Sequence, residues 1–181
     1  MTLSHAILAT LLSGPVSGYK LAKRFNRTIG YFWQATHQQI YRELAALEEH
    51  DYVQPVASSS SSTEKQYMLT REGQDFLTQW VAQPAEPGAL REDLLVKVRA
   101  GILVSPDVLL VELHRRRAFH AEKLAVYQAV QERDFPEPQH LTYEQRLLYL
   151  PLLRGIMFET DNIAWCDAAL NFLQEEAPLP S

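Results

Sequence analysis

The feature that most constrains the fold is a change of hydrophobic period near residue 50. Residues 36–49 have the i, i+4, i+7 apolar spacing of a half-buried helix, carried by Ile40, Leu44 and Leu47. Residues 52–56 and 65–69 are short β-prone runs around a serine-rich turn, a pattern typical of a β-hairpin. Thr70 then fits the N-cap of another helix that ends near Val81, with an inner face of Phe76, Leu77, Trp80 and Val81.

Two more helices are expected upstream of this change. Residues 3–12 should form a short buried helix, which Gly14 and Pro15 end. Ser17 fits the N-cap of a second helix, from Gly18 to about Asn26, that buries Leu21, Ala22 and Phe25. Residues 30–33 form an aromatic connector, more typical of core packing than of a ligand site. Three helices, a hairpin and a fourth helix make the order of a winged helix-turn-helix.

The helix at 36–49 is the predicted recognition helix. Thr36 and Gln39 have the spacing of a capping box, so the helix should begin at Thr36. Side chains of Gln and Arg can form two hydrogen bonds with a base edge, and N-terminal residues of a recognition helix reach those edges. The predicted base-reading residues are His37, Gln38, Arg42 and Gln39. Gln39 either contacts bases as well as serving the helix cap, or serves the cap alone. An ordinary solvated face is the alternative.

The charge of the chain is unevenly distributed. The net charge of -5 argues against indiscriminate nucleic-acid binding. However, residues 1–42 hold five Lys and Arg residues and no Asp or Glu, whereas residues 43–82 and residues 83–181 each carry -5. A basic segment in an acidic chain is suited to phosphate binding, although a solvated basic helix would give the same pattern. The predicted DNA-backbone contacts are Tyr19, Lys20, Lys23, Arg24, Arg27, Tyr41 and Lys65.

The second half of the chain is predicted to be a separate helical domain. Residues 83–89 have the composition of a linker, which divides a domain at 1–82 from one at 90–181. An amphipathic stripe follows, formed by Leu90, Leu94, Leu95, Val98 and Ile102. Ser105 and Pro106 should start a long helix that ends near Arg133. Thr142 and Gln145 fit a capping box for the last helix, which Pro151 should kink or restart.

The last helix carries two apolar rows, each with a seven-residue repeat. A helix that is apolar on two sides usually has two partners, here the long helix of its own chain and a second chain. Packing within a single monomer is the alternative. The predicted dimerisation residues are Ile156, Ile163 and Leu170 in one row and Phe158, Trp165 and Phe172 in the other.

Composition points to the cytoplasm and away from membranes. A chain of 181 residues with 46% hydrophobic content can bury a core, but no apolar run reaches the ~20 residues of a membrane-spanning helix. Residues 1–12 lack the features of a signal peptide. The single cysteine, Cys166, cannot form an internal disulfide and is suited to a reducing compartment.

Nothing in the sequence favours an enzyme, a metal site or a cofactor. Cys166 lies in an apolar helical row with no histidine near it in sequence, so it is expected to be a packed thiol. His114 and His120 are six residues apart and should lie on opposite sides of a helix, unlike a ligand pair at i, i+4. No phosphate-binding or dinucleotide-binding glycine motif is present.

Several segments together resemble the PadR family of bacterial transcription regulators, and most closely its AphA-like virulence-activator branch. The N-terminal resemblance lies in SGYKLAKRF (17–25), IGYFWQATHQQIYREL (29–44), LEEHDYV (47–53) and QYMLTREG (66–73). In the second half, REDLLVKVRAG (91–101) and NIAWCDAAL (162–170) are similar to the helical C-terminal domain of that branch. The resemblance covers essentially the whole chain.

The resemblance implies a mainly α protein with a winged helix-turn-helix and an all-helical dimerisation domain. It further implies a homodimer that binds double-stranded DNA at a partly palindromic operator. Two residues depart from the family: Asp51 stands where glycine is common, and Lys65 is the only base left in the wing. The alternatives are a protein-binding adaptor, or a ligand-responsive repressor of a detoxification or efflux gene, since a small-molecule effector is possible although not evident.

Overall fold

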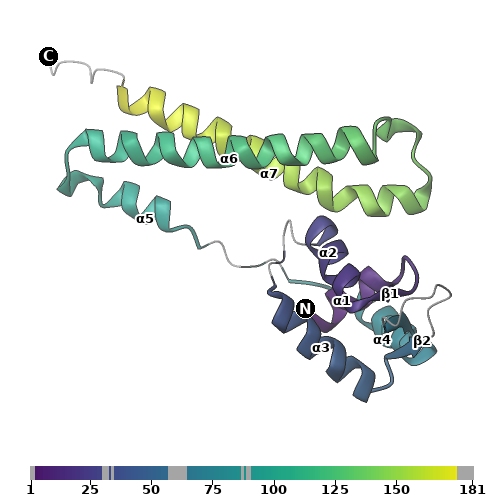
Figure 1. Ribbon diagram of the computed structural model, residues 1–181. Helices are drawn as coiled ribbons and strands as arrows, with labels where there is room; N and C mark the ends of the chain where they lie inside the picture. Colours follow the sequence, from purple (N-terminus) through teal and green to yellow (C-terminus); the bar gives the residue numbers. More distant parts are fainter. Residues whose placement is uncertain are drawn as a thin grey trace, which may run out of the picture. The chain divides into compact units, whose positions relative to one another are not determined.

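The computed structural model describes residues 3–29, 33, 35–56, 65–86, 88 and 91–174, with only the backbone described for residues 26–28. The chain divides into two compact units, residues 1–86 and residues 87–181, as Figure 1 shows. Each unit has a hydrophobic cluster of its own.

The N-terminal unit has the element order that the sequence predicts. Its helices are α1 (Leu3–Leu11), α2 (Gly18–Thr28), α3 (His37–Glu49) and α4 (Arg71–Val81). Its strands are β1 (Val16–Ser17), β2 (Val53–Val56) and β3 (Gln66–Leu69). The predicted winged helix-turn-helix is therefore confirmed, with β2 and β3 as the strands of the wing.

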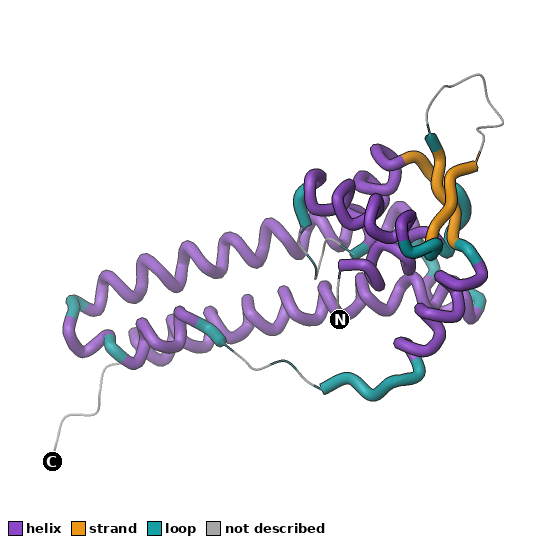
Figure 2. The backbone as a smooth tube through the Cα atoms, turned by 90° about the horizontal axis from the view of Figure 1, so that it is seen from below, coloured by secondary structure: helices purple, strands orange, loops and turns teal. Residues whose placement is uncertain are grey.

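The small sheet includes one strand that the sequence does not predict. β1 pairs antiparallel with β3, with Val16 opposite Tyr67, and the strand order is β1-β3-β2 (Figure 2). Two residues are too short to show the alternation that marks a strand. β2 lies at the edge of the sheet, as Pro55 predicts. Proline has no backbone N–H group, and one side of an edge strand has no neighbouring strand that would need it.

The core of the N-terminal unit joins all four helices to the sheet. Fourteen buried apolar residues form it among the described residues, and Leu21, Phe25 and Ile40 are completely buried. Trp33 packs against this core, whereas residues 30–32 of the predicted aromatic connector and residues 57–64 of the wing lie outside the described residues. The prediction that Val81 lies on the inner face of α4 is wrong. Val81 is 69% exposed, because it is the last residue of the helix and lies beyond the core.

Side-chain caps fix where three of these helices begin. The hydroxyls of Ser17, Thr36 and Thr70 accept hydrogen bonds from the backbone N–H groups of Lys20, Gln39 and Gly73, respectively. Each cap satisfies an N–H group that the helix itself cannot pair. All three were predicted from the sequence.

The end of α3 is a Schellman motif with an aspartate in the glycine position. The N–H of Asp51 donates to the Glu48 carbonyl, and the N–H of Tyr52 donates to the Leu47 carbonyl over 2.9 Å. Asp51 has a φ of 57°, in the left-handed region that favours glycine. The turn into the wing thus keeps its hydrogen bonds, despite the departure from the family residue.

The C-terminal unit is built from two long helices. Its elements are α5 (Asp93–Arg99), η1 (Gly101–Leu103), α6 (Pro106–Asp134), η2 (Pro138–His140) and α7 (Tyr143–Gln174). α6 and α7 run antiparallel, side by side (Figures 1 and 2). α7 continues through Pro151, so the helix does not restart there. No helix among the described residues is long and apolar enough to cross a membrane.

The predicted apolar stripe before α6 is only partly buried. Leu94 is buried with Leu113 and Leu170, and Val98 packs beside them. In contrast, Leu95 is 43% and Ile102 is 91% exposed, while Leu90 lies outside the described residues. α5 is a single short helix, and Ile102 lies in η1 after its end, so one helical period does not extend across the whole stripe.

Candidate nucleic-acid interface

The first two turns of α3 separate a buried face from an exposed one. Ile40 and Leu44 are at most 1% exposed and hold the helix against the core. On the opposite side the predicted base-reading residues are all exposed: His37, Gln38, Gln39 and Arg42. The helix therefore presents a polar surface on a rigid support, which a base-reading helix requires.

Gln39 has a second role in the structure. Its side-chain oxygen accepts a hydrogen bond from the backbone N–H of Thr36 over 2.8 Å, which completes the capping box. The oxygen is thus engaged, whereas the side-chain NH₂ group is still able to donate. His37, Gln38 and Arg42 have no such task in the cap.

The predicted DNA-backbone residues of α2 are not equally available. Tyr19 is 57% exposed, and Lys20 and Lys23 are exposed beside it. Arg24 is only half-exposed, and its Nη1 atom is shielded from solvent. The side chain of Arg27 lies outside the described residues. Among the described side chains of α2, the fully exposed cations are therefore Lys20 and Lys23.

Lys65, the base predicted to assist from the wing, is held by α3. Its ammonium group donates to both carboxylate oxygens of Glu48 over 2.8 Å, and it lies 5.1 Å from the ring centre of Tyr67. The hydrogen bond to Glu48 raises the pKa of Lys65. To reach a phosphate, Lys65 would have to exchange this carboxylate for it.

Two contacts that the sequence reasoning missed fix the position of α3. The ring of Tyr41, which is 46% exposed, lies so close to Gly18 that a Cβ there would be 2.6 Å from its Cε1 atom. Ser4 of α1 donates a hydrogen bond to the carboxylate of Glu43. Glycine at 18 therefore allows α2 and α3 to approach closely. The only signal in the sequence was the spacing of Gly18 and Tyr41, which does not show that they touch.

The two apolar rows of α7 differ in their surroundings. Leu170 is buried with Leu94 and Leu113 of its own chain, and Ile156 and Ile163 are half-buried. The other row is exposed: Phe158 by 45%, Trp165 by 37% and Phe172 by 78%. Cys166 is buried, as predicted, and burial raises the pKa of its thiol.

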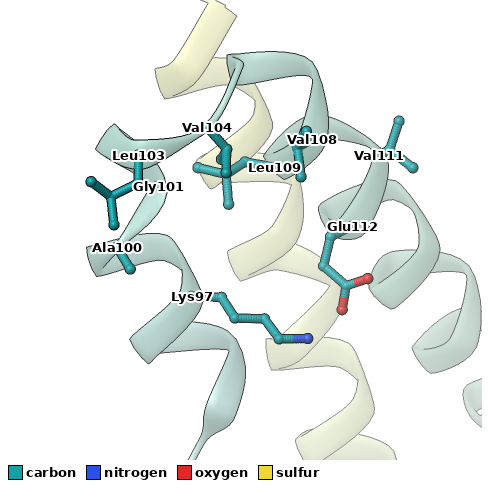
Figure 3. A pocket seen from close by; sticks show the side chains of 9 residues that line it. All are labelled: Lys97, Ala100, Gly101, Leu103, Val104, Val108, Leu109, Val111 and Glu112. Carbon is teal, nitrogen blue, oxygen red and sulfur yellow. The ribbon is translucent and has the colours of Figure 1, made fainter.

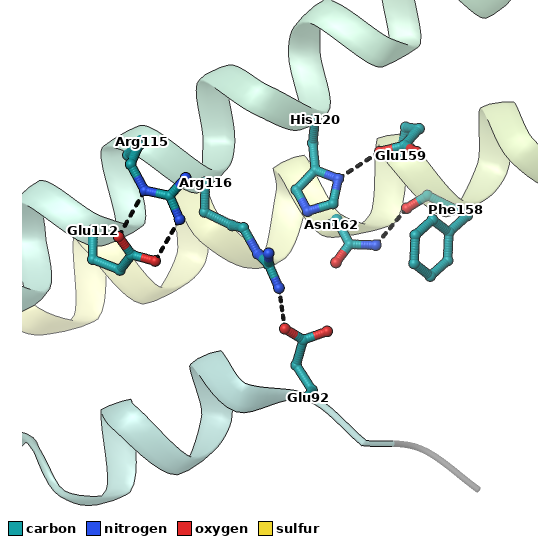
Figure 4. A network of polar contacts seen from close by, with 8 residues as sticks. All are labelled: Glu92, Glu112, Arg115, Arg116, His120, Phe158, Glu159 and Asn162. Carbon is teal, nitrogen blue, oxygen red and sulfur yellow. Dashed lines mark hydrogen bonds and ion pairs between the residues drawn. The ribbon is translucent and has the colours of Figure 1, made fainter. Parts of the chain in front are cut away.

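A buried polar pair joins α6 to α7, which the sequence reasoning also missed. Nδ1 of His120 lies 2.5 Å from Oε2 of Glu159, and both residues are at most 5% exposed (Figure 4). Next to it, Arg116 pairs with Glu92, before α5. Within the described part of the chain, no three His, Cys, Asp or Glu side chains converge on a point that could hold a metal ion.

Family models match both units. Residues 7–79 match the model described as "Transcriptional regulator PadR-like family", and residues 90–174 match "Virulence activator alpha C-term". A probable transcriptional regulator from Mycobacterium tuberculosis is 36% identical over an alignment of 188 positions, which covers 97% of this chain and 100% of that protein.

Solved structures with similar folds cover almost the whole chain. The virulence activator AphA of Vibrio cholerae has 31% identity and a TM-score of 0.80, over 95% of this chain and 98% of its own. Bacillus subtilis PadR in complex with operator DNA has 23% identity and a TM-score of 0.83, over 94% of this chain and 97% of its own.

These matches confirm the sequence-based prediction of a regulator rather than an enzyme. The C-terminal unit also agrees with the predicted virulence-activator branch. The chain belongs to the PadR-like family of transcriptional regulators.

Proposed function

We propose that this protein binds a partly palindromic operator in the cytoplasm as a homodimer and reads its sequence with the N-terminal half of α3. The observation that carries this proposal is the exposed polar face of α3, where His37, Gln38 and Arg42 lie opposite the buried apolar face of the helix. The operator complex of Bacillus subtilis PadR, which has the same fold, supports DNA as the partner.

The proposal divides the surface by task. Arg42 and Gln38 contact base edges, because guanidinium and amide groups can each form two hydrogen bonds with one base. Lys20, Lys23 and Tyr19 of α2 contact phosphates, which position the protein without reading the sequence. Glu48, Glu49 and Asp51 make the far end of α3 acidic, so that end faces away from the DNA.

A homodimer is supported by the exposed apolar side chains of the C-terminal unit. α6 and α7 bury mainly the side chains that lie between them. Phe158, Trp165 and Phe172 of α7 stay in contact with solvent. Pairs of such helical hairpins commonly bury these faces in a four-helix arrangement. A two-fold dimer would place one α3 in each of two half-sites, one helical turn or a small multiple of it apart.

The test is DNA binding measured by fluorescence anisotropy on DNA from upstream of the gene, against shuffled DNA, at several salt concentrations. Arg42→Ala should cost about 1–3 kcal/mol on the operator and blur the preference over shuffled DNA. Lys23→Ala should weaken both DNAs alike and reduce the salt dependence. Glu49→Ala, at the far end of the same helix, is the matched control that should retain the preference.

Two results would contradict parts of this proposal. An intact operator preference in Arg42→Ala would remove Arg42 from the base-reading surface. The absence of any salt-sensitive binding would favour the protein-binding adaptor instead.

A ligand-responsive repressor is the second candidate. Bacillus subtilis PadR, 25% identical to this chain, has been crystallised with p-coumaric acid. If this chain responds to such ligands, p-coumaric acid should release the operator DNA in the same anisotropy measurement. An operator affinity that p-coumaric acid leaves unchanged would count against that compound as an effector.

A further inference from the structure

The C-terminal unit has an apolar groove between α5, η1 and the start of α6 (Figure 3). Its volume is about 460 Å³. Figure 3 shows aliphatic side chains along the groove, with one cation and one carboxylate beside them. The residues that line the groove include Leu103, Val104, Val108, Val111, Lys97 and Glu112.

Close packing at one glycine shapes the floor of this groove. A Cβ on Gly101 would lie 2.3 Å from Cδ1 of Leu109, so the Leu109 side chain packs directly against the backbone of η1 and would have to shift for any larger residue. The N–H of Val104 donates to the Gly101 carbonyl over 3.1 Å and closes the turn. The groove is therefore a packed feature of the fold.

Large apolar side chains that line the groove are exposed to solvent. Leu103 is 83% exposed, and Val111 is 69% exposed. Each square ångström of such surface removed from water contributes roughly 25 cal/mol, so covering the groove would be favourable. An apolar patch of this kind usually marks a contact surface.

The same unit carries a second exposed apolar surface at the same end. α7 runs antiparallel to α6, and Arg117 of α6 pairs with Asp167 of α7 over 2.5 Å. Counted from this pair along two antiparallel helices, Phe172 lies level with about residue 112, beside the groove, and Trp165 lies two turns further along α6. Phe172 follows Leu170 by two positions, about 200° around the helix, so it points away from the side that Leu170 buries. It does not fill the groove of its own chain.

We infer that the groove receives Trp165 and Phe172 of α7 from a second copy of this chain. This inference rests on the proposed homodimer and identifies which surfaces meet in it. In a two-fold dimer the contact occurs twice, because each chain offers one groove and one aromatic row. Large aromatic side chains seated in an apolar pocket are the usual anchors of such interfaces.

The charges around the groove are complementary to the end of a second α7. Arg115 binds both oxygens of Glu112 over 2.7 Å, so that carboxylate is already paired. Lys97 has no ion pair among the described residues. The unsatisfied carbonyl groups at the C-terminus of a helix carry partial negative charge, which a lysine stabilises.

A charge-complementation experiment tests which surfaces meet. Leu103→Asp alters the groove and Phe172→Lys alters the aromatic row, and both residues are exposed enough that the protomer should keep its fold. Each variant alone should raise the dissociation constant of the dimer by roughly 30-fold or more, as the loss of an interface anchor does. Mixing the two should restore a dimer with one chain of each kind, because aspartate then faces lysine.

The measurement is sedimentation equilibrium, with circular dichroism to verify the helix content. Leu12→Asp is the matched control, since Leu12 is an exposed leucine of the N-terminal unit and should not affect the dimer. If both single variants remain dimeric, or if the mixture stays monomeric, the pairing of groove and row is overturned while the homodimer stands. A monomeric wild-type protein would overturn the homodimer itself.

A small amphipathic acid is the other possible occupant of the groove. Decanoate serves as the probe, because its carboxylate could bind Lys97 and its chain could cover the valines. Decanoate binding to an intact wild-type dimer that Leu103→Asp abolishes without dissociating the dimer would overturn the inference. No decanoate binding at the groove of the wild-type dimer is the expected result.

Discussion

The two units of this protein bury their apolar side chains in different ways. In the N-terminal unit, fourteen described residues form one core that includes all four helices and the sheet. In the C-terminal unit, Leu94, Leu113 and Leu170 form a cluster of three, while Phe172, Leu103 and Val111 are largely exposed. The first unit buries its apolar side chains in one closed core, whereas the second leaves large apolar side chains on its surface, as the proposed homodimer requires.

The difference also extends to polar groups. The N-terminal unit uses hydroxyl caps at the helix ends, which local sequence specifies. Among its described residues, the C-terminal unit has one such cap, the predicted capping box of Thr142 and Gln145. In addition, it buries His120 against Glu159 between two helices. A buried polar pair of this kind favours one alignment of the helices over others, because any shift leaves both groups without a partner.

The largest effect is expected from breaking that pair. His120→Leu leaves the Glu159 carboxylate buried without its partner and should cost about 3–5 kcal/mol of unfolding free energy. Replacing both residues by leucine should recover most of this loss, since no unpaired group is left. Urea unfolding at one fixed protein concentration measures both variants. A single variant as stable as wild type would show that the pair does not hold α6 to α7.

The next effect concerns the closed core of the N-terminal unit. A Cβ on Gly73 would lie 2.1 Å from the carbonyl oxygen of Tyr52, so Gly73→Ala should destabilise this unit by about 3 kcal/mol. Gly88→Ala is the matched control, because no atom lies within 4 Å of its added methyl group. Hydrogen exchange should locate the loss in residues 1–86. Equal protection in both variants would contradict the close packing at Gly73.

A smaller effect, of opposite sign, is expected at the end of α3. Asp51 occupies the left-handed region with a φ of 57°, where glycine has no steric cost. Asp51→Gly should therefore stabilise the N-terminal unit by about 1 kcal/mol. Thermal unfolding of the variant and wild type measures it. A lower unfolding temperature would indicate that the aspartate side chain contributes more than its backbone strain costs.

The smallest effect is a pH dependence that belongs to the N-terminal unit. His5 stacks on Phe76 and Trp80, and burial lowers its pKa below the ordinary value of 6.5. The unfolded chain then binds a proton that the folded chain does not, so stability is full above pH 6.5 and falls as the pH drops toward the lowered pKa. His5→Phe should lose this part of the acid sensitivity. Unfolding temperatures of both proteins between about pH 7.5 and about pH 5.5 measure it.

Local patterns predicted much of the fold, and contacts between distant residues account for what they missed. The caps at Ser17, Thr36 and Thr70 depend on residues three positions away, and they occur as predicted. β1 exists only because β3 pairs with it, and His120 meets Glu159 from another helix, 39 residues further along the chain. Periodicity along one helix contains no information on either contact.

The candidate site shows the same limit. The exposed face of α3 follows from its period, whereas the approach of Tyr41 to Gly18 depends on the packing of two helices. Lys65 was predicted to contact a DNA phosphate, but in the structure it forms an ion pair with Glu48 of α3. Leu95 and Ile102 belong to the predicted amphipathic stripe and are exposed, because apolar spacing does not show whether a residue packs within its own chain.

The measurement that tests the account most directly is a hydroxyl-radical footprint of the full-length protein on DNA from upstream of its gene. Two closed reading units joined through a shared C-terminal interface should protect two symmetry-related half-sites, one helical turn or a small multiple apart. Arg42→Ala should lose protection at both half-sites together. A single continuous footprint without symmetry, or no footprint at all, would contradict the account.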